Sequence, residues 1–192
     1  INKFVASEIL NMRDGAQSGL EVGTYLFDDE GTLGSDTLVI DNGILKSGIS
    51  DLLSALYLGT KPTGNGRRES YERKAYARMT NTFFESGNST LEDMIKATKK
   101  GYLLEGYFSG MEDPKNWGIQ CTIAKGKEII DGEFTGKVIS PVALTGYVPD
   151  LLKSISMVAQ NPIELSGSGD CGKGHKEWVK TSLAPGSRVV KN

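Results

Sequence analysis

The stretch Thr37-Leu38-Val39-Ile40-Asp41-Asn42-Gly43-Ile44-Leu45-Lys46 gives the strongest indication of the fold. Short apolar runs flank Asp41-Asn42-Gly43, and an Asn-Gly pair tolerates the positive φ angles of a type I′ turn. We therefore expect an antiparallel hairpin with strands over residues 37–40 and 44–46. A tight hairpin favours an antiparallel sheet over a series of β-α-β units.

The same pattern of short apolar runs and turns extends along the chain. Glycine accounts for 24 of the 192 residues, well above the usual ~7%, which favours tight turns and makes a long helical bundle a poor fit. Further strands are predicted over residues 24–27, 79–85, 118–124, 128–130, 134–139 and 187–191, with turns at Gly126 and at Asp131-Gly132.

Three segments have the apolar spacing of short amphipathic helices. The first covers residues 49–56 and is expected to end at Gly59. In the second, Ser89 and Glu92 have the spacing of a capping box. The third covers residues 149–158, with Pro149 in its first turn and an apolar stripe along one face. Strands outnumber helices, so the sequence predicts an α+β fold: a largely antiparallel β-sheet with about three short amphipathic helices.

Composition excludes several classes of protein. Hydrophobic residues make up 38% and charged residues 24%, as in a soluble globular domain, so we expect one domain over residues 1–192. The net charge of −2 gives no chain-wide attraction to nucleic acid or anionic lipid. No apolar run approaches the ~18–20 residues that a membrane span needs.

The two cysteines, Cys121 and Cys171, lie fifty residues apart in no CxxC pattern. This excludes a zinc ribbon or a disulfide framework built by this chain alone and favours a reducing compartment. His175 is the single histidine, so a two-histidine metal motif is impossible within this sequence. Cys121 lies in an alternating β pattern and is expected in the core.

Cys171 lies in the glycine-rich stretch from Gly167 to Gly174. The spacing approaches that of a phosphate loop, but Gly174 stands where a Ser or Thr hydroxyl would hold magnesium. Glycines and Lys173 around Cys171 suit a thiolate that acts as a metal ligand or a nucleophile on a loop. The alternative is an unreactive, half-buried loop cysteine.

Two charged segments have open interpretations. Residues 61–78 hold six cations against two glutamates, around Tyr71 and Tyr76, and this suits a solvated loop, single-stranded nucleic acid or a grip on carboxylates and carbonyls. Asp28-Asp29-Glu30 suits acid/base chemistry or a hard cation, but also an ordinary acidic turn.

Several of these segments together resemble one family. The motifs are Phe27-Asp28-Asp29-Glu30-Gly31-Thr32, Ile40-Asp41-Asn42-Gly43-Ile44-Leu45-Lys46, Thr63-Gly64-Asn65-Gly66-Arg67-Arg68, Arg78-Met79-Thr80-Asn81-Thr82 and Cys171-Gly172-Lys173. In order and spacing they are similar to the C-terminal part of TldD/PmbA metallopeptidases, also called modulators of DNA gyrase. The likeness covers nearly the whole chain.

The resemblance implies a cytoplasmic zinc protease that cleaves unstructured peptides as a TldD and TldE assembly or as a homodimer. TldD-like subunits carry an upstream His-Glu-x-x-x-His motif, whose two histidines hold zinc together with one cysteine and whose glutamate acts as general base. Cys171 matches that cysteine, so this chain is expected to supply a metal ligand and no catalytic residue. The residues expected to line the peptide cleft are Asn65, Gly66, Arg67, Arg68, Thr80 and Asn81.

The start of the chain, Val5-Ala6-Ser7-Glu8, looks like the stretch that follows the His-Glu helix in this family. We therefore expect a fragment that begins after the catalytic motif and is inactive alone, without tightly bound zinc. TldE-like subunits generally lack this cysteine and the intact Thr63–Arg68 run, which favours the TldD side. The alternatives are a non-catalytic peptide-binding or assembly subunit of the TldE type and, third, a nucleic-acid-binding module based on residues 61–78.

Overall fold

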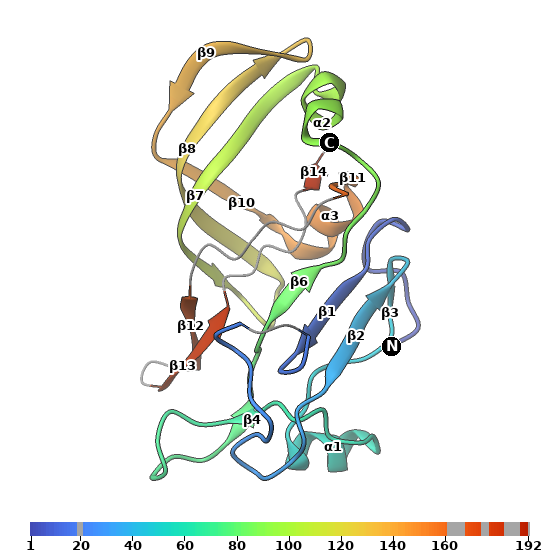
Figure 1. Ribbon diagram of the computed structural model, residues 1–192, viewed down its shortest axis with the longest axis vertical. Helices are drawn as coiled ribbons and strands as arrows, with labels where there is room; N and C mark the ends of the chain where they lie inside the picture. The colour runs from blue at the N-terminus through green and yellow to red at the C-terminus, as the bar shows by residue number, and fades with distance from the viewer. Residues whose placement is uncertain (19–20, 161–167, 174–176, 183–188, 192) are drawn as a thin grey trace.

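The computed structural model describes residues 1–18, 21–160, 168–173, 177–182 and 189–191. The described part is α+β, with three short helices, and every pair of named strands in it is antiparallel, as the sequence predicts (Figure 1). The strands are β1 (Met12–Gly15), β2 (Asp36–Asp41), β3 (Ile44–Leu45), β4 (Gly66–Arg67), β5 (Tyr76–Ala77), β6 (Thr82–Phe84), β7 (Lys100–Glu112), β8 (Gly118–Ile130), β9 (Glu133–Ile139), β10 (Val142–Tyr147), β11 (Ile155–Val158), β12 (Ser168–Lys173), β13 (Glu177–Ser182) and β14 (Val189–Lys191). The helices are α1 (Leu52–Leu58), α2 (Leu91–Ala97) and α3 (Val148–Lys153).

The predicted hairpin forms the edge of a sheet in the order β3-β2-β1-β6. Asn42 and Gly43 have φ angles of 46° and 77°, which confirms the expected type I′ geometry. One face of this sheet meets a small hydrophobic core of Ala6, Leu10, Ile40, Ile155 and Val158.

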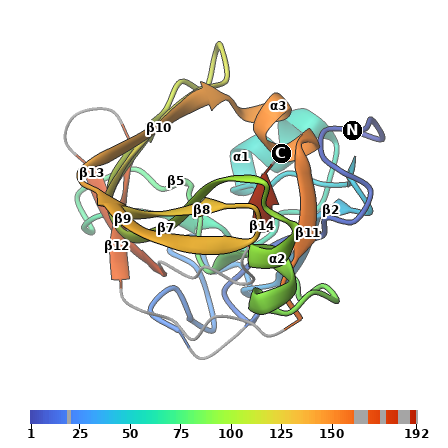
Figure 2. The ribbon, with the colours of Figure 1, turned by 90° about the horizontal axis from the view of Figure 1, so that it is seen from above.

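A second sheet is built around the two 13-residue strands β7 and β8. β10 pairs with the first half of β8 and β9 with its second half. Figure 2 shows β10 leading away from β8 and β9 toward α3. The predicted turn at Gly126 is wrong: this residue lies in mid-strand between Leu104 and Ile139, where a side chain would crowd both neighbours. The predicted turn at Asp131-Gly132 joins β8 to β9, and both residues have positive φ.

The first two helices follow the sequence closely. Asp51 caps α1, and Gly59 ends it in the left-handed conformation, as predicted. The capping box of α2 lies one residue later than predicted, with Thr90 and Asp93 exchanging hydrogen bonds. Ser89 cannot act as the cap because its backbone pairs with Val158 and Gln160.

The third predicted helix is half wrong. α3 contains Pro149 in its first turn but ends at Lys153. Residues 155–158 form β11 instead, which pairs with β14. Ile155 and Val158 are 3% and 4% exposed in the core, and their β-branched side chains favour an extended backbone.

Several predicted strands also need correction. Residues 24–27 form no strand apart from one bridge between Phe27 and Leu33, and the strand predicted over residues 79–85 shortens to β6. Strands β1, β4, β5, β7, β10 and β13 were not predicted. Cys171 lies in strand β12 rather than in a glycine-rich loop, while Gly167, Gly174 and His175 lie outside the described residues.

Candidate functional site

A buried carboxylate, Asp14 on β1, organises two of the sequence motifs. Asp14 is 2% exposed. Its Oδ1 accepts hydrogen bonds from Asn65 Nδ2 at 2.7 Å and Thr80 Oγ1 at 2.9 Å, and its Oδ2 accepts from the Thr80 amide at 2.9 Å and from Thr82 Oγ1. Because four donors converge on one buried carboxylate, the Thr63–Arg68 and Arg78–Thr82 segments are fixed side by side.

Three of the expected cleft residues lie inside this network. Asn65, Thr80 and Asn81 are 1%, 0% and 1% exposed. The Asn65 amide group also donates to the carbonyl of Arg78 at 3.0 Å, and Asn81 donates to the carbonyl of Gly15 at 3.0 Å. The structure therefore brings these side chains together, but as a buried layer beneath the surface.

The acidic turn holds backbone amides of the same region. Asp28 Oδ1 accepts from the amides of Glu30 and Thr32 within its own turn, and its Oδ2 accepts from the Gly66 amide at 2.8 Å. Asp29 and Glu30 accept from the amides of Arg68 and Leu52, both at 2.8 Å. These bonds favour the interpretation of Asp28-Asp29-Glu30 as a structural turn that anchors β4 and the start of α1.

Arg67 and Arg68 of the predicted cleft differ in their surroundings. Arg67 lies over the Tyr25 ring at 5.3 Å and donates to the carbonyls of Met79 at 2.7 Å and Lys180 at 2.5 Å. Burial lowers the pKa of the Arg67 guanidinium, although Tyr25 and Cys171 oppose the shift. The Arg68 side chain is 35% exposed and lies 4.0 Å from Asp29, so it is the more accessible of the two.

Cys171 lies on the inward face of the β12–β13 hairpin. It pairs with Val179, and directly paired residues of an antiparallel ladder point to the same side. Val179 is 5% exposed, whereas its neighbour Trp178 is 52% exposed on the opposite face. Cys171 is half-buried, and its carbonyl accepts a hydrogen bond from the buried Arg78 side chain.

The same hairpin is tied to the Asp14 layer at its other end. Thr181 donates through its hydroxyl to the Thr80 carbonyl, and the Ser182 hydroxyl donates to Asn81 Oδ1 at 2.5 Å. The two motifs and the strand pair that holds Cys171 thus form one connected assembly. Figure 1 shows β12 and β13 at the left, above β4.

The described residues contain no group of three His, Cys, Asp or Glu side chains that could hold a metal ion. Cys171 is one soft thiol ligand of the kind that zinc takes, but zinc sites in proteins use three or four protein ligands. Cys121 lies in a strand as the sequence predicts, on β8 in a different sheet, but it is half-buried and does not belong to the core. Burial raises the pKa of the Cys121 thiol, which disfavours its thiolate form.

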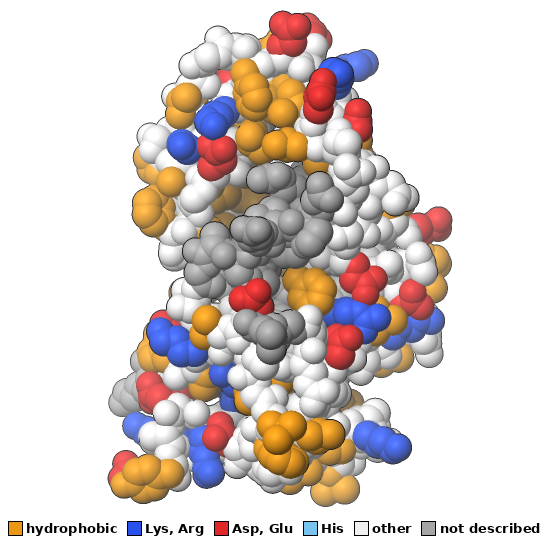
Figure 3. All heavy atoms as spheres, in the orientation of Figure 1, with side chains coloured by type: hydrophobic (Ala, Val, Ile, Leu, Met, Phe, Trp, Pro, Cys, Tyr) orange, Lys and Arg blue, Asp and Glu red, His pale blue; other side chains and the backbone are white. Residues whose placement is uncertain are grey.

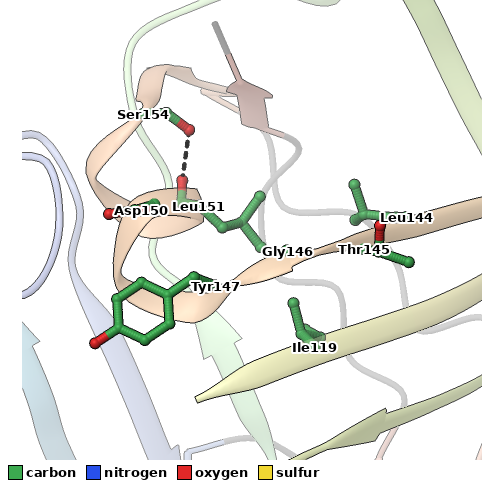
Figure 4. A pocket seen from close by; sticks show the side chains of 8 residues that line it. All are labelled: Ile119, Leu144, Thr145, Gly146, Tyr147, Asp150, Leu151 and Ser154. Atoms are coloured by element: carbon green, nitrogen blue, oxygen red, sulfur yellow. Dashed lines mark hydrogen bonds between the residues drawn. The ribbon is translucent and has the colours of Figure 1, made fainter. Parts of the chain in front are cut away.

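Hollows in the described part of the chain lie on other elements. One of about 340 Å³ lies between β8, β10 and α3 and is drawn in Figure 4. Ile119, Leu144 and Leu151 give it an apolar wall, and Ser154 turns its hydroxyl to the Leu151 carbonyl at 2.8 Å. None of its lining residues belongs to the predicted site.

Two important residues had no assigned role in the sequence analysis. Asp14 precedes Gly15 in a segment without apolar periodicity, so no local pattern marks it as buried. Arg78 belongs to a quoted motif, but its charge suggested a place in a basic loop. Instead Arg67 and Arg78 turn inward, which removes two of the six cations of residues 61–78 from any exposed basic surface.

Apolar surface is exposed elsewhere, above all on α1. Leu56, Tyr57 and Leu58 of this helix are 77%, 82% and 68% exposed. Figure 3 shows hydrophobic side chains, in orange, gathered over the region of α1 near the lower end of the molecule. No described helix is long and apolar enough to cross a membrane.

Comparison with known proteins gives consistent matches. Residues 1–182 match the family described as the PmbA/TldA metallopeptidase C-terminal domain. A metalloprotease TldD homolog from Buchnera aphidicola subsp. Acyrthosiphon pisum is 36% identical over 176 residues, which is 90% of this chain and 36% of that protein. A zinc metalloprotease TldD homolog from Saccharolobus solfataricus is 31% identical over 191 residues, 99% of this chain and 42% of that protein.

Solved structures share the fold. TldE from Thermococcus kodakarensis superimposes with a TM-score of 0.71 at 24% identity, covering 100% of this chain and 42% of that one. A protein from Thermotoga maritima described as a modulator of a DNA gyrase also gives 0.71, at 21% identity, over 99% of this chain and 41% of its own. The chain thus spans roughly two fifths of these proteins or less.

Proposed function

Because the chain belongs to the PmbA/TldA metallopeptidase family through its C-terminal domain, we propose that it supplies one zinc ligand and part of the peptide cleft of a zinc metallopeptidase. The observation that supports this most directly is the connection of the Cys171 hairpin to the two motifs expected at the cleft. Arg78, Thr181 and Ser182 link it to the Arg78–Thr82 motif, and the bond from Arg67 to the Lys180 carbonyl links it to the Thr63–Arg68 motif.

Cys171 is the ligand that we assign to this chain. A half-buried thiol on the inward face of a hydrogen-bonded hairpin is held in one orientation, which suits a metal ligand. Since the described residues offer no second or third ligand beside it, the remaining ligands come from elsewhere: the upstream His-Glu-x-x-x-His motif expected for TldD-like proteins. Zinc, when bound there, supplies a Lewis acid that polarises the scissile carbonyl.

The peptide cleft is divided into contacting and supporting residues. Arg68 has an accessible guanidinium, and Arg67 lies beside it, so we assign both to the carbonyls or a carboxylate of an extended peptide. Gly66, Asn65, Thr80 and Asn81 lie beneath them and hold the backbone in place. Unstructured peptides are the substrate class that suits such a cleft, in the cytoplasm, with a TldE/PmbA-like partner or a second copy completing the assembly.

The experiment compares Cys171→Ser with Cys121→Ser in the full-length parent protein. Serine replaces a soft anionic ligand with a neutral hydroxyl, so Cys171→Ser should lower zinc affinity steeply and abolish peptide cleavage. Cys121→Ser should leave zinc content and cleavage unchanged, because Cys121 lies on β8. Full zinc and full activity in a folded Cys171→Ser protein would contradict the assignment of Cys171 as the zinc ligand. A full-length parent protein that binds no zinc and cleaves no peptide would instead favour the non-catalytic TldE-type subunit.

A further inference from the structure

Arg78 is an unusual buried cation. It is 2% exposed, and no described carboxylate forms an ion pair with it. Its Nε and Nη1 are buried and find no hydrogen-bond partner among the described residues. A buried charge without a counter-ion is costly, and such an orphaned group in a folded protein calls for a specific explanation.

The bonds that Arg78 does make converge on the strand pair around Cys171. Its Nη2 donates to the carbonyl of Cys171 on β12 and, at 3.3 Å, to the carbonyl of Glu177 on β13. One guanidinium nitrogen therefore holds both strands of the hairpin, beside the candidate ligand.

The backbone of Arg78 is fixed from the opposite side. Its amide donates to the Asn65 carbonyl at 2.9 Å, and its carbonyl accepts from Asn65 Nδ2, which also binds Asp14. Because the Arg78 backbone is fixed and its guanidinium group is planar, the guanidinium has little freedom to move. Arg78 therefore links β12, which carries Cys171, to the sheet that contains β1 and β6, here called the β1–β6 layer.

We propose that Arg78 is a positioning residue for Cys171: it fixes the β12 backbone at the ligand, so that the thiol meets the metal in one geometry. The proposal rests on the proposed function in that Cys171 is taken as the zinc ligand. Replacing a residue that holds a metal ligand in place without touching the metal typically lowers metal affinity by 10–100-fold. An ordinary buried hydrophobic residue would pack here without fixing a carbonyl.

The test uses Arg78→Lys and Arg78→Met in the full-length parent protein, with Arg13→Lys as the matched control. Lysine keeps the charge but lacks the planar fork, and methionine fills the volume without charge. Arg13 bonds two carboxylates, Asp36 and Glu85, neither of which belongs to the hairpin. Thermal unfolding followed by circular dichroism establishes that each variant is folded.

The first measurement needs no metal. Alkylation of Cys171 by iodoacetamide in zinc-free protein, followed by mass spectrometry with Cys121 as the internal reference, reports how firmly the hairpin is held. Loss of the hydrogen bonds from the guanidinium to the Cys171 and Glu177 carbonyls should raise the Cys171 rate about tenfold or more in both Arg78 variants and leave it unchanged in Arg13→Lys. An unchanged Cys171 rate would overturn the proposal.

The second measurement uses Co²⁺ in place of zinc. The Arg78 variants should bind Co²⁺ at least about tenfold more weakly, with a changed thiolate-to-metal absorption band. If Cys171→Ser abolishes the band while both Arg78 variants keep wild-type affinity and band, the positioning role is wrong and the proposed function stands. If Cys171→Ser leaves the band intact, the proposed ligand is wrong. Failure of both Arg78 variants to fold would overturn the role in favour of a general structural one.

Discussion

Asn65 donates a hydrogen bond to Asp14, 51 residues earlier in the chain, over 2.7 Å in a fully buried setting. The same amide nitrogen also donates to the carbonyl of Arg78, so one side chain ties the first strand to both downstream motifs. The expected cleft residues therefore depend on a carboxylate that lies outside every motif.

Asp14→Asn should destabilise the fold strongly. The new amide group would turn a donor toward Asn65 Nδ2 or the Thr80 amide, which are donors themselves. We expect a loss of about 3 kcal/mol in the free energy of unfolding, measured by urea denaturation. Asp41→Asn, at the partly exposed end of β2, should change it by less than about 0.5 kcal/mol. Equal effects of the two substitutions would show that the Asp14 network contributes no special stability.

Asp51 should make the stability of the fold depend on pH. Burial opposes its ionisation, but hydrogen bonds from Ser54 and from the Ala77 amide outweigh it, so the pKa of Asp51 is lowered below its ordinary 3.8. A carboxylate whose pKa is lower in the folded state stabilises fully above the unfolded pKa and loses this effect as pH falls through the folded value.

The measurement compares wild type with Asp51→Asn across pH. Asparagine is a competent helix cap but carries no charge, so the variant should be less stable by about 1 kcal/mol at pH 7. The difference should shrink as the pH falls from about 4 toward 2, in chemical denaturation series at constant salt. A difference that stays constant over this interval would mean that the Asp51 charge does not contribute.

Arg67→Ala should affect both turnover and stability. Arg67 binds the Met79 and Lys180 carbonyls, so its removal deletes two hydrogen bonds, neither of them at Cys171, and lowers the unfolding free energy by about 2 kcal/mol. In the full-length protein, peptide turnover should fall while zinc content stays intact. Arg73→Ala, whose side chain is exposed, is the control and should keep both. Unchanged turnover in folded Arg67→Ala would exclude Arg67 from the peptide contacts.

The 192-residue chain alone should hold no stoichiometric zinc and cleave no peptide. It offers one matched ligand, and the described residues contain no cluster able to complete a site. Metal analysis after dialysis against zinc, together with a fluorogenic peptide assay, checks both points. One zinc per chain that is lost in Cys171→Ser would contradict the expectation and would bring His175 into consideration as a ligand.

Sequence patterns predicted turns and helix ends correctly where the backbone conformation of a few neighbouring residues determines the structure. The Asn42-Gly43 turn and the Gly59 stop follow from backbone conformations that few residues adopt. The Cys171 loop was predicted wrongly because glycines usually mark turns, whereas here Gly169 and Gly172 lie within a paired strand. Pairing with β13 supplies the stability that the glycines lack, and no local pattern reveals a partner strand.

The sequence predicted which residues gather at the candidate site, but it did not predict how they are arranged or which of them are buried. The motifs named Asn65, Thr80 and Asn81, but Asn65 and Thr80 are held by Asp14, whose partners lie 51 to 68 residues away, and Asn81 is held by the carbonyl of Gly15. The position of Ile155 and Val158 was missed for a similar reason. Their spacing fits a helix, yet contact with a core formed by Leu10 and Ile40 selects the strand.

The β12–β13 hairpin makes its anchoring bonds to residues 93 to 113 positions earlier. During synthesis at about 5–20 residues per second, the β1–β6 layer leaves the ribosome roughly 5–20 s before the hairpin does. The earlier layer can therefore fold first and serve as a template onto which the Cys171 strand docks. Docking of the Cys171 strand then follows the folding of the earlier layer, and slow closure of these long-range contacts sets when the thiol reaches its folded position.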